Sequence, residues 1–249
     1  MITAVKDALQ RQQYLRAAMA QDYFRAVMGL RLSLYGETPA AGWQFYTGGR
    51  GVCAALAVRG DTAFACGAWE TEELAAFLAF LGATHLLAAE RLSLPGWRPE
   101  KSLSLYVLPA GVQLPLPPCE TAFTLLREPP MRTVTHLLWG GAPDADAFYA
   151  ESCAARNRGW AEYRLALCGG EAVSTVGACA IFGGEAYMAA GETAQGWRGK
   201  GIGGRLIVQL ANELAARGER VTLLCEAALC PFYARLGFMA AGTYLQMTR

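Results

Sequence analysis

The sequence has 249 residues, of which 53% are hydrophobic and 17% are charged, with a formal net charge of +1. This composition excludes a disordered chain, and the length allows one large hydrophobic core or two ordinary ones. A nearly neutral chain without long blocks of like charge gives no sign of a nucleic-acid partner or of an anionic membrane partner.

The sequence also lacks the features of membrane proteins, secreted proteins and metalloproteins. The longest apolar run in the first half, Leu74 to Leu81, is far shorter than the ~20 residues that cross a bilayer, and the first residues have no signal-peptide core. We therefore expect a cytoplasmic protein without a membrane partner. The sequence has eight cysteines and two histidines, and no two cysteines form a C-x-x-C pair, so we expect no metal site. Most of the cysteines lie in apolar runs, which favours reduced, buried thiols.

The first half combines helices with strands. Residues 4–34 are rich in apolar residues at helical spacing, which predicts a helical segment. Strands are predicted at 43–46, 52–58 and 62–68, the last two joined by a turn at Arg59-Gly60-Asp61. A helix over 72–81 then stops at Gly82, and further strands are predicted at 85–89 and 102–108.

The middle of the chain is rich in proline. Six prolines lie between Pro109 and Pro130, around the short apolar piece from Phe123 to Leu126. Proline density of this kind is typical of a stiff connection between domains. We therefore predict a first domain over 1–110, a linker over 111–131 and a second domain over 132–249.

The second half is predicted to hold a mostly antiparallel sheet. It begins with a strand at 133–139 and a helix at 143–156, and extended segments follow at 162–168, 172–182 and 185–193. Further on, apolar residues at 206, 207, 210 and 214 predict a helix over 206–217, and a strand is predicted at 221–225.

The stretch from Gln195 to Arg205 opens that helix with five glycines and three cationic side chains. A helix start has N–H groups without intrahelical partners and carries partial positive charge. Glycines at 199, 201, 203 and 204 keep Cβ atoms away from these N–H groups, and Arg198, Lys200 and Arg205 add positive charge. The loop is therefore predicted to bind a pyrophosphate.

Two common phosphate loops fit this stretch poorly. The glycines satisfy G-x-G-x-x-G, but a dinucleotide-binding fold requires a buried strand directly before them and more βα units after them. A Walker A loop requires Gly-Lys-Ser/Thr, whereas Lys200 is followed by Gly201. A nucleotide-phosphate enzyme using the same loop stays as an alternative, which binding of ATP or NAD would reveal.

Two motifs in order point to a known family. Arg198-Gly-Lys-Gly201-Ile-Gly203 fits the pattern R/Q-x-x-G-x-G/A, and Tyr233-Ala-Arg-Leu-Gly237-Phe238 fits Tyr-x-x-x-Gly-Phe. They are separated by the predicted helix and strand, and together they resemble the motifs of the GNAT superfamily of acyltransferases. The resemblance implies an α/β (α+β) fold, in which a mixed, mostly antiparallel sheet is flanked by helices, in tandem with a smaller α/β N-terminal domain.

The order of elements in the first half favours a degenerate GNAT-like domain with a structural or substrate-shaping role. Its helix opens with Glu70-Thr-Glu-Glu73 where a phosphate loop would be expected. Because carboxylates at a helix start repel a pyrophosphate, we predict that this half does not bind CoA.

The resemblance also implies acetyl-CoA as the acyl donor. The backbone of 191–195 would take the pantetheine arm as an added strand, although Thr193-Ala-Gln195 stands where the family usually has Val-x-Pro. The residues expected to bind acetyl-CoA are Gly191, Thr193, Ala194, Gln195, Arg198, Gly199, Lys200, Gly201, Ile202, Gly203, Gly204 and Arg205.

Three side chains are candidates for the chemistry. Tyr233 would protonate the departing thiolate as a general acid; the alternative is an aromatic side chain that only packs. Glu192 and Glu226 are candidate general bases, and for each the alternative is a solvated carboxylate at a strand end. Glu226 stands where many members of the family have asparagine.

The resulting hypothesis is an N-acetyltransferase that moves an acetyl group from acetyl-CoA to a primary amine of a small-molecule or peptide acceptor that the sequence does not identify. The alternative is a CoA- or acyl-CoA-binding module without turnover, with a sensing or regulatory role. A homodimer is left open as the assembly state.

Overall fold

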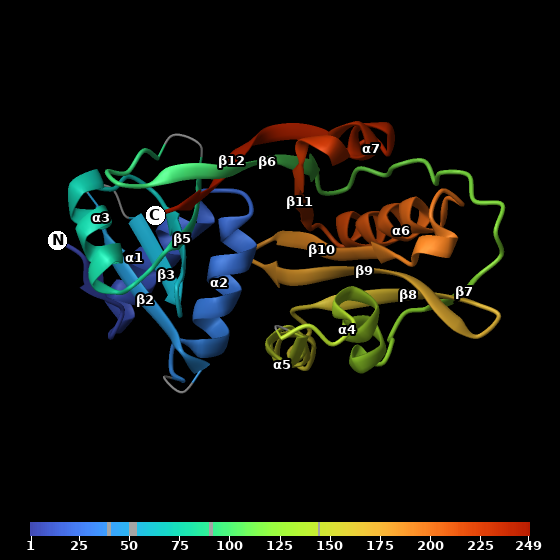
Figure 1. Ribbon diagram of the computed structural model, residues 1–249, viewed down its shortest axis with the longest axis horizontal. Coiled ribbons are helices and arrows are strands. Elements are labelled where there is room, and N and C mark those ends of the chain that lie inside the picture. Colours follow the sequence, from blue (N-terminus) through green and yellow to red (C-terminus); the bar gives the residue numbers. More distant parts are fainter. Residues whose placement is uncertain (39–40, 50–53, 90–91, 144) are drawn as a thin grey trace. The chain divides into compact units, whose positions relative to one another are not determined.

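The computed structural model describes residues 1–38, 41–49, 54–89, 92–143 and 145–249 (Figure 1). Residues 52 and 53 of the strand predicted at 52–58, including Cys53, and residue 144 of the helix predicted at 143–156 lie outside the described residues. By its contacts the chain divides into two compact units. Unit 1 comprises residues 1–106, 224–230 and 240–249, and unit 2 comprises residues 107–223 and 231–239.

Unit 1 is a twisted sheet with helices packed on it (Figure 1). Its elements are β1 (Thr3–Ala4), α1 (Ala8–Met19), α2 (Phe24–Tyr35), β2 (Trp43–Gly48), β3 (Ala54–Arg59), β4 (Thr62–Cys66), α3 (Thr71–Phe80), β5 (His85–Ala89), η3 (Ala227–Leu229) and most of β6 (Arg98–Leu108) and β12 (Met239–Thr248). Leu74 and Leu78 of α3 are fully buried against Leu56 and Leu86 of the sheet. The apolar face of α3 thus forms a hydrophobic core of this unit.

The strand order of unit 1 is β1-β2-β3-β4-β5-β12-β6, so the last strand of the chain lies inside the sheet of the first unit. Strand β12 pairs with β5 antiparallel, from Tyr244 opposite Ala89 to Thr248 opposite His85. The domain boundaries expected at residues 110 and 132 stay a prediction, but the contacts group the C-terminal strand with the N-terminal half of the chain.

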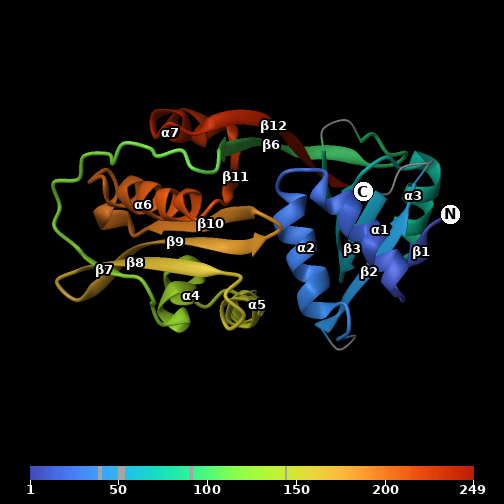
Figure 2. The same cartoon turned by 180° about the vertical axis from the view of Figure 1, so that it is seen from behind.

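Unit 2 is a sheet of order β11-β10-β9-β8-β7 between helices. Its elements are β7 (Thr124–Leu126), α4 (Met131–Trp139), α5 (Ala145–Arg156), β8 (Glu162–Cys168), β9 (Glu171–Phe182), β10 (Glu185–Thr193), η2 (Gln195–Trp197), α6 (Ile202–Ala216), the first part of β11 (Arg220–Glu226) and most of α7 (Cys230–Arg235). Helix α6 covers one face of this sheet, and α4 and α5 cover the other (Figures 1 and 2). The fold class expected from the sequence is confirmed.

The two units repeat one arrangement. In unit 1, the antiparallel strands β2, β3 and β4 are followed by α3, and β5 then pairs parallel with β4. In unit 2, the antiparallel strands β8, β9 and β10 are followed by α6, and β11 then pairs parallel with β10. A parallel neighbour requires a crossover, and in both units one helix supplies it. The tandem interpretation of the sequence therefore holds in the fold.

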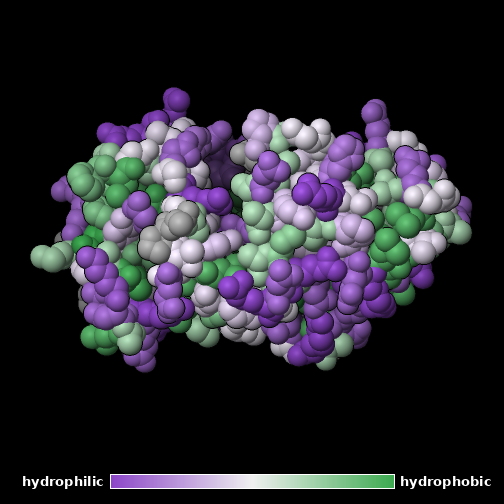
Figure 3. Space-filling model, turned by 90° about the horizontal axis from the view of Figure 1, so that it is seen from below, coloured by the Kyte–Doolittle hydropathy of each residue, from purple (hydrophilic) through white to green (hydrophobic). Residues whose placement is uncertain are grey.

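The strand predicted at 133–139 is wrong, because this segment is helix α4. Its β-branched residues Thr133, Val134 and Thr135 favour a strand by propensity alone. However, the buried residues Met131, Val134 and Thr135 share one face at helical spacing, and Gly140 ends the helix in the left-handed conformation. Figure 3 views the protein from the side on which α4 and α5 lie in Figure 1, and hydrophilic residues gather on part of that face.

The segment expected to be a linker contains a strand. Residues Thr124–Leu126 form β7, which pairs antiparallel with β8 through Thr124 opposite Leu167 and Leu126 opposite Leu165.

Among the helices of the described residues, we find no candidate for a membrane-spanning segment, because none combines the required length with sufficient hydrophobicity.

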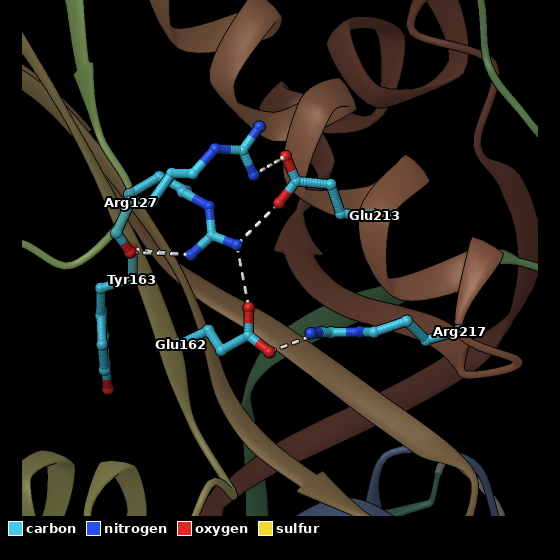
Figure 4. A network of polar contacts seen from close by, with 6 residues as sticks. Arg127, Glu162, Tyr163, Glu213 and Arg217 are labelled. Carbon is cyan, nitrogen blue, oxygen red and sulfur yellow. Dashed lines mark hydrogen bonds and ion pairs between the residues drawn. The ribbon is translucent and has the colours of Figure 1, made fainter.

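A network of ion pairs ties α6 to the sheet of unit 2 (Figure 4). Arg164 of β8 has a side chain that is only 7% exposed, and it bonds Glu162 at 2.9 Å and Glu213 of α6 at 2.7 Å. Arg127 and Arg217 complete the network on Glu213 and Glu162, respectively. Removal of one partner from such a network leaves an uncompensated buried charge, which costs about 3–5 kcal/mol. The network therefore fixes the helix that begins at the glycine loop.

The network makes stability dependent on pH through Glu162. Burial alone would raise the pKa of Glu162, but hydrogen bonds from Arg217 and Arg164 outweigh it, so the pKa lies below its usual value. A lowered folded-state pKa gives stability that is present above the unfolded pKa of about 4.3 and is lost as the pH falls through the folded value.

We expect the free energy of unfolding of the wild type to fall as the pH drops from about 5 toward the lowered pKa of Glu162. The variant Glu162→Gln should be less stable at pH 7 and should lose less stability on acidification. Urea unfolding at a series of pH values measures both slopes, with Glu171→Gln at the exposed first residue of β9 as the control. Parallel pH curves for the wild type and Glu162→Gln would contradict this.

Candidate active site

The loop between β10 and α6 borders a cavity in unit 2. After β10 ends at Thr193, the chain makes one 3-10 turn, η2, and enters α6 at Ile202. The cavity has a volume of about 310 Å³. Its lining residues are Thr193, Trp197, Arg198, Gly199, Gly201, Ile202, Gly203, Gly204 and Phe232. Phe232 lies on α7 and directly precedes Tyr233, the first residue of the second sequence motif.

The cavity is bordered by a helix start that no side chain caps. Gly201, the residue directly before α6, has a left-handed φ of 82°. The first turn of the helix receives no hydrogen bond from a capping side chain. The first N–H groups of a helix have no intrahelical acceptor, and the first turn of α6 contains no acidic residue. These features suit an anionic ligand. The matching helix of unit 1, α3, has Glu72 and Glu73 in its first turn.

The three cationic side chains of the loop differ in their surroundings. The Arg198 guanidinium donates to the Thr193 carbonyl at 2.9 Å and to Glu192 Oε1 at 2.8 Å. The Lys200 ammonium lies 4.4 Å from the ring centroid of Trp197. Arg205 donates to the Pro117 carbonyl at 3.2 Å. Of the three cations, Arg198 belongs to the lining of the cavity.

Strand β10 leaves its parallel neighbour before it reaches the loop. Within the described residues, β10 pairs with β11 only from Glu185 to Tyr187, whereas β10 itself continues to Thr193. A bulge accompanies the change, with a register shift after Ala189 and a positive φ of 54° at Ala190. An unpaired strand edge of this kind can accept an extended ligand through backbone hydrogen bonds.

Ser174 on β9, which was not among the predicted site residues, forms hydrogen bonds to the end of β10. Ser174 is fully buried, and its hydroxyl donates to the Glu192 carbonyl at 3.0 Å and lies 2.8 Å from the Thr193 hydroxyl. The register places Ser174 opposite Thr193. Only the pairing of two strands brings these residues together, and no local sequence signal indicates it.

Tyr233 lies on α7 in an aromatic cluster. Its ring is 5.1 Å from the ring of Phe232 and 6.1 Å from the ring of Phe238, both in edge-on orientations. Pro231 occupies the first turn of α7, where a missing N–H costs nothing. The expected helix start and the neighbouring aromatics are therefore in place, and Tyr233 itself is partly exposed.

Both candidate bases form ion pairs. Glu192 accepts from Arg198 and, through the same Oε1, from the backbone N–H of Thr193 at 3.0 Å. Glu226, the last residue of β11, pairs with Lys101 at 2.8 Å, and this hydrogen bond raises the pKa of Lys101. Each carboxylate thus has a structural partner in the unit to which it belongs.

The structure brings seven of the twelve expected coenzyme-binding residues to the cavity: Thr193, Arg198, Gly199, Gly201, Ile202, Gly203 and Gly204. Gly191, Ala194, Gln195, Lys200 and Arg205 are near in sequence but do not belong to the lining. Trp197 and Phe232, which line the cavity, were not expected as binding residues. Each is an aromatic residue that directly precedes a motif, at Arg198 and at Tyr233, and that position was the available signal.

Residues 117–119, expected to be part of a linker, pack against the loop. A Cβ atom on Gly201 would lie 2.5 Å from the Pro118 carbonyl oxygen, and one on Gly203 would lie 2.8 Å from the Thr193 hydroxyl. The Cys119 thiol also donates to the Lys200 carbonyl at 3.4 Å. Protein packing therefore requires glycine at both positions. A Cβ on Gly199 would meet nothing within 4 Å.

Comparison with known families agrees with this geometry. Residues 156–240 match the family model described as an acetyltransferase (GNAT) domain. This part of the chain is a GNAT-type acetyltransferase domain. The match includes β8 to β11, the glycine loop and the helix with Tyr233. Among curated proteins, no match to the chain was found.

Solved structures of GNAT proteins share the fold over most or all of the chain. A GCN5-related N-acetyltransferase from Sphaerobacter thermophilus matches with a TM-score of 0.67 and 14% identity, covering 100% of this chain and 95% of that one. A tandem GNAT protein from the clavulanic acid biosynthesis pathway matches with a TM-score of 0.65 and 14% identity, covering 100% and 98%. A GCN5-related N-acetyltransferase from Kribbella flavida matches with a TM-score of 0.58 and 15% identity, covering 78% and 86%.

We expect Gly201→Ala to destabilise the GNAT domain more than Gly199→Ala. Both glycines have positive φ, 82° and 77°, so both alanines add strain of roughly 1–2 kcal/mol. Only Gly201→Ala also meets the Pro118 carbonyl, and such overpacking costs about 1–3 kcal/mol more. Urea unfolding without ligand measures the difference. Equal free energies of unfolding would show that residues 117–119 are not held against the loop.

Proposed function

We propose that this protein transfers an acetyl group from acetyl-CoA to a primary amine. The observation that carries the proposal is the uncapped start of α6 at Gly201, which opens on a cavity of about 310 Å³ within a GNAT domain. The residues present fit the donor: the loop offers backbone N–H groups and a cationic side chain, without an acidic residue in the first turn of the helix.

The start of α6 and the edge of β10 would bind different parts of acetyl-CoA. The amides that begin α6 would hold the diphosphate, assisted by Arg198, because backbone N–H groups and positive charge both favour phosphate oxygens. The edge of β10 beyond Tyr187 would bond the pantetheine arm as an added strand, with Gly191, Ala194 and Gln195 in this segment. Lys200 and Arg205 would add positive charge around the same loop.

Acetyl-CoA, when bound, supplies the activated acyl group of a thioester. Tyr233 would donate its phenolic proton to the departing sulfur, which avoids release of a free thiolate. Bringing donor and acceptor together in one complex supplies a large share of the rate enhancement, so the protein's main task is orientation.

Glu192 and Glu226 stay the proposed candidates for accepting the proton of the amine. Because Glu192 is ion-paired with Arg198 and bonded to the N–H of Thr193, we propose that it mainly positions Arg198 and the end of β10. Glu226 would have to exchange its ion pair with Lys101 before it could serve as a base.

The acceptor is proposed only as a class, a small-molecule or peptide amine. A cytoplasmic location and the prediction that the N-terminal half does not bind CoA also stay predictions.

The test is an assay of CoA release from acetyl-CoA with a panel of primary amines, run on the wild type and on Tyr233→Phe. We expect Tyr233→Phe to keep its affinity for acetyl-CoA and to lose about 10²-fold in kcat, because its ring still packs and only the proton donor is absent. Tyr149→Phe on α5, where the ring stacks under Arg132, is the matched control and should behave as the wild type.

Two outcomes would contradict the proposal. Full activity of Tyr233→Phe would remove the phenol from the chemistry. Binding of acetyl-CoA without turnover of any amine would favour a CoA-binding module with a sensing or regulatory role.

A further inference from the structure

Two cysteines face each other across the connection between β11 and α7. Cys225 is buried near the end of β11, and Cys230 is the partly exposed first residue of α7. Their Sγ atoms are 4.0 Å apart. Four exposed residues, 226–229, join them, and three of these form the short turn η3. The two sulfurs are thus neighbours at the end of a short, solvent-facing connection.

The two thiols differ in reactivity. Hydrogen bonds from the hydroxyl of Ser104 and from the phenol of Tyr106 on β6, together with one from Cys225, outweigh desolvation and lower the pKa of Cys230. Burial, by contrast, raises the pKa of Cys225 to about 12. The thiolate is the nucleophilic form of cysteine, so Cys230 is the thiol of this pair that a solvent-borne reagent would meet first. Cys225 lies behind it as a protonated partner.

We propose that Cys230 is a peroxide-reactive thiol that closes a reversible disulfide with Cys225. The geometry requires only a local change, because a disulfide has an S–S length of about 2.05 Å, about 2 Å less than the present separation. The connection 226–229 is exposed along its whole length, so no packed side chain has to move out of a core for it to adjust.

The reaction balances with hydrogen peroxide as the oxidant. The Cys230 thiolate attacks one peroxide oxygen, the O–O bond breaks, and a sulfenic acid and hydroxide form; sulfur loses two electrons and peroxide gains them. The Cys225 sulfur then attacks the Cys230 sulfur, so that the S–S bond forms and the S–O bond breaks. The leaving hydroxide takes the Cys225 proton and departs as water.

The disulfide would act on the start of the helix that carries Tyr233, three residues beyond Cys230. A displacement of about 1 Å in a catalytic group can cost about 10²-fold in rate. Oxidation should therefore slow acetyl transfer. This consequence rests on the proposed function, whereas the formation of the disulfide does not depend on it.

Mass spectrometry of the full-length protein tests the disulfide directly. Trypsin cleaves after Arg220 and Arg235, so both cysteines fall on one peptide, 221–235. After hydrogen peroxide treatment this peptide should lose two hydrogens and resist alkylation, and dithiothreitol should reverse both changes. Cys225→Ser should stop at a sulfenic acid on Cys230 that dimedone traps, whereas Cys230→Ser should stay unoxidised in this peptide.

Two results would overturn the disulfide. One is that, after hydrogen peroxide treatment, both thiols of peptide 221–235 can still be alkylated although Cys153, a partly exposed cysteine on α5, has been oxidised. The other is trapping of sulfenic acid in Cys230→Ser to the same extent as in Cys225→Ser, because it would show that Cys230 is not the reactive thiol.

The rate of acetyl transfer tests the consequence separately. Oxidation should lower kcat at least about tenfold in the wild type and in Cys153→Ser, with recovery in dithiothreitol, and it should leave Cys230→Ser unchanged. A fully active disulfide form would overturn the coupling to Tyr233. Absence of turnover in the reduced wild type would instead refute the proposed function, and the peptide mass would still decide the disulfide.

Discussion

The left-handed backbone of Gly201 is the constraint on which the site depends. With φ of 82°, it lets the chain turn from the loop into α6 without a capping side chain, so the first amides of the helix stay available beside the cavity. The same residue has no room for a Cβ, because the Pro118 carbonyl would lie 2.5 Å away. One glycine thus satisfies both the turn and the packing of residues 117–119.

The rest of unit 2 holds this turn in position. The sheet places the end of β10 beside the loop, and buried Ser174 fixes it by hydrogen bonds across the strand pair. At the other end of α6, Glu213 anchors the helix to Arg164 on β8 (Figure 4). Because β10 and α6 are both held in place, the loop between them is pre-organised, which would lower the entropy cost of binding the proposed coenzyme.

The sequence predicted the loop, its helix and the motif at Tyr233 because their signals are local: glycine, positive charge and helical spacing occur within a few residues. It failed where long-range contacts decide. Val134 and its β-branched neighbours favour a strand, yet burial of one face makes them α4. The pairing of β12 with β5 and the packing of Pro118 on Gly201 join residues more than eighty positions apart, and no local pattern encodes such contacts. Glu192 forms an ion pair with Arg198, six residues further along the chain, and its role as a base stays a prediction.

The most direct measurement is a crystal structure of the protein with acetyl-CoA. Our account predicts the diphosphate oxygens within hydrogen-bond distance of the backbone N–H groups of residues 199–204 and the thioester sulfur beside the phenol of Tyr233. A coenzyme bound away from this loop, or a Tyr233 hydroxyl far from the sulfur, would contradict it.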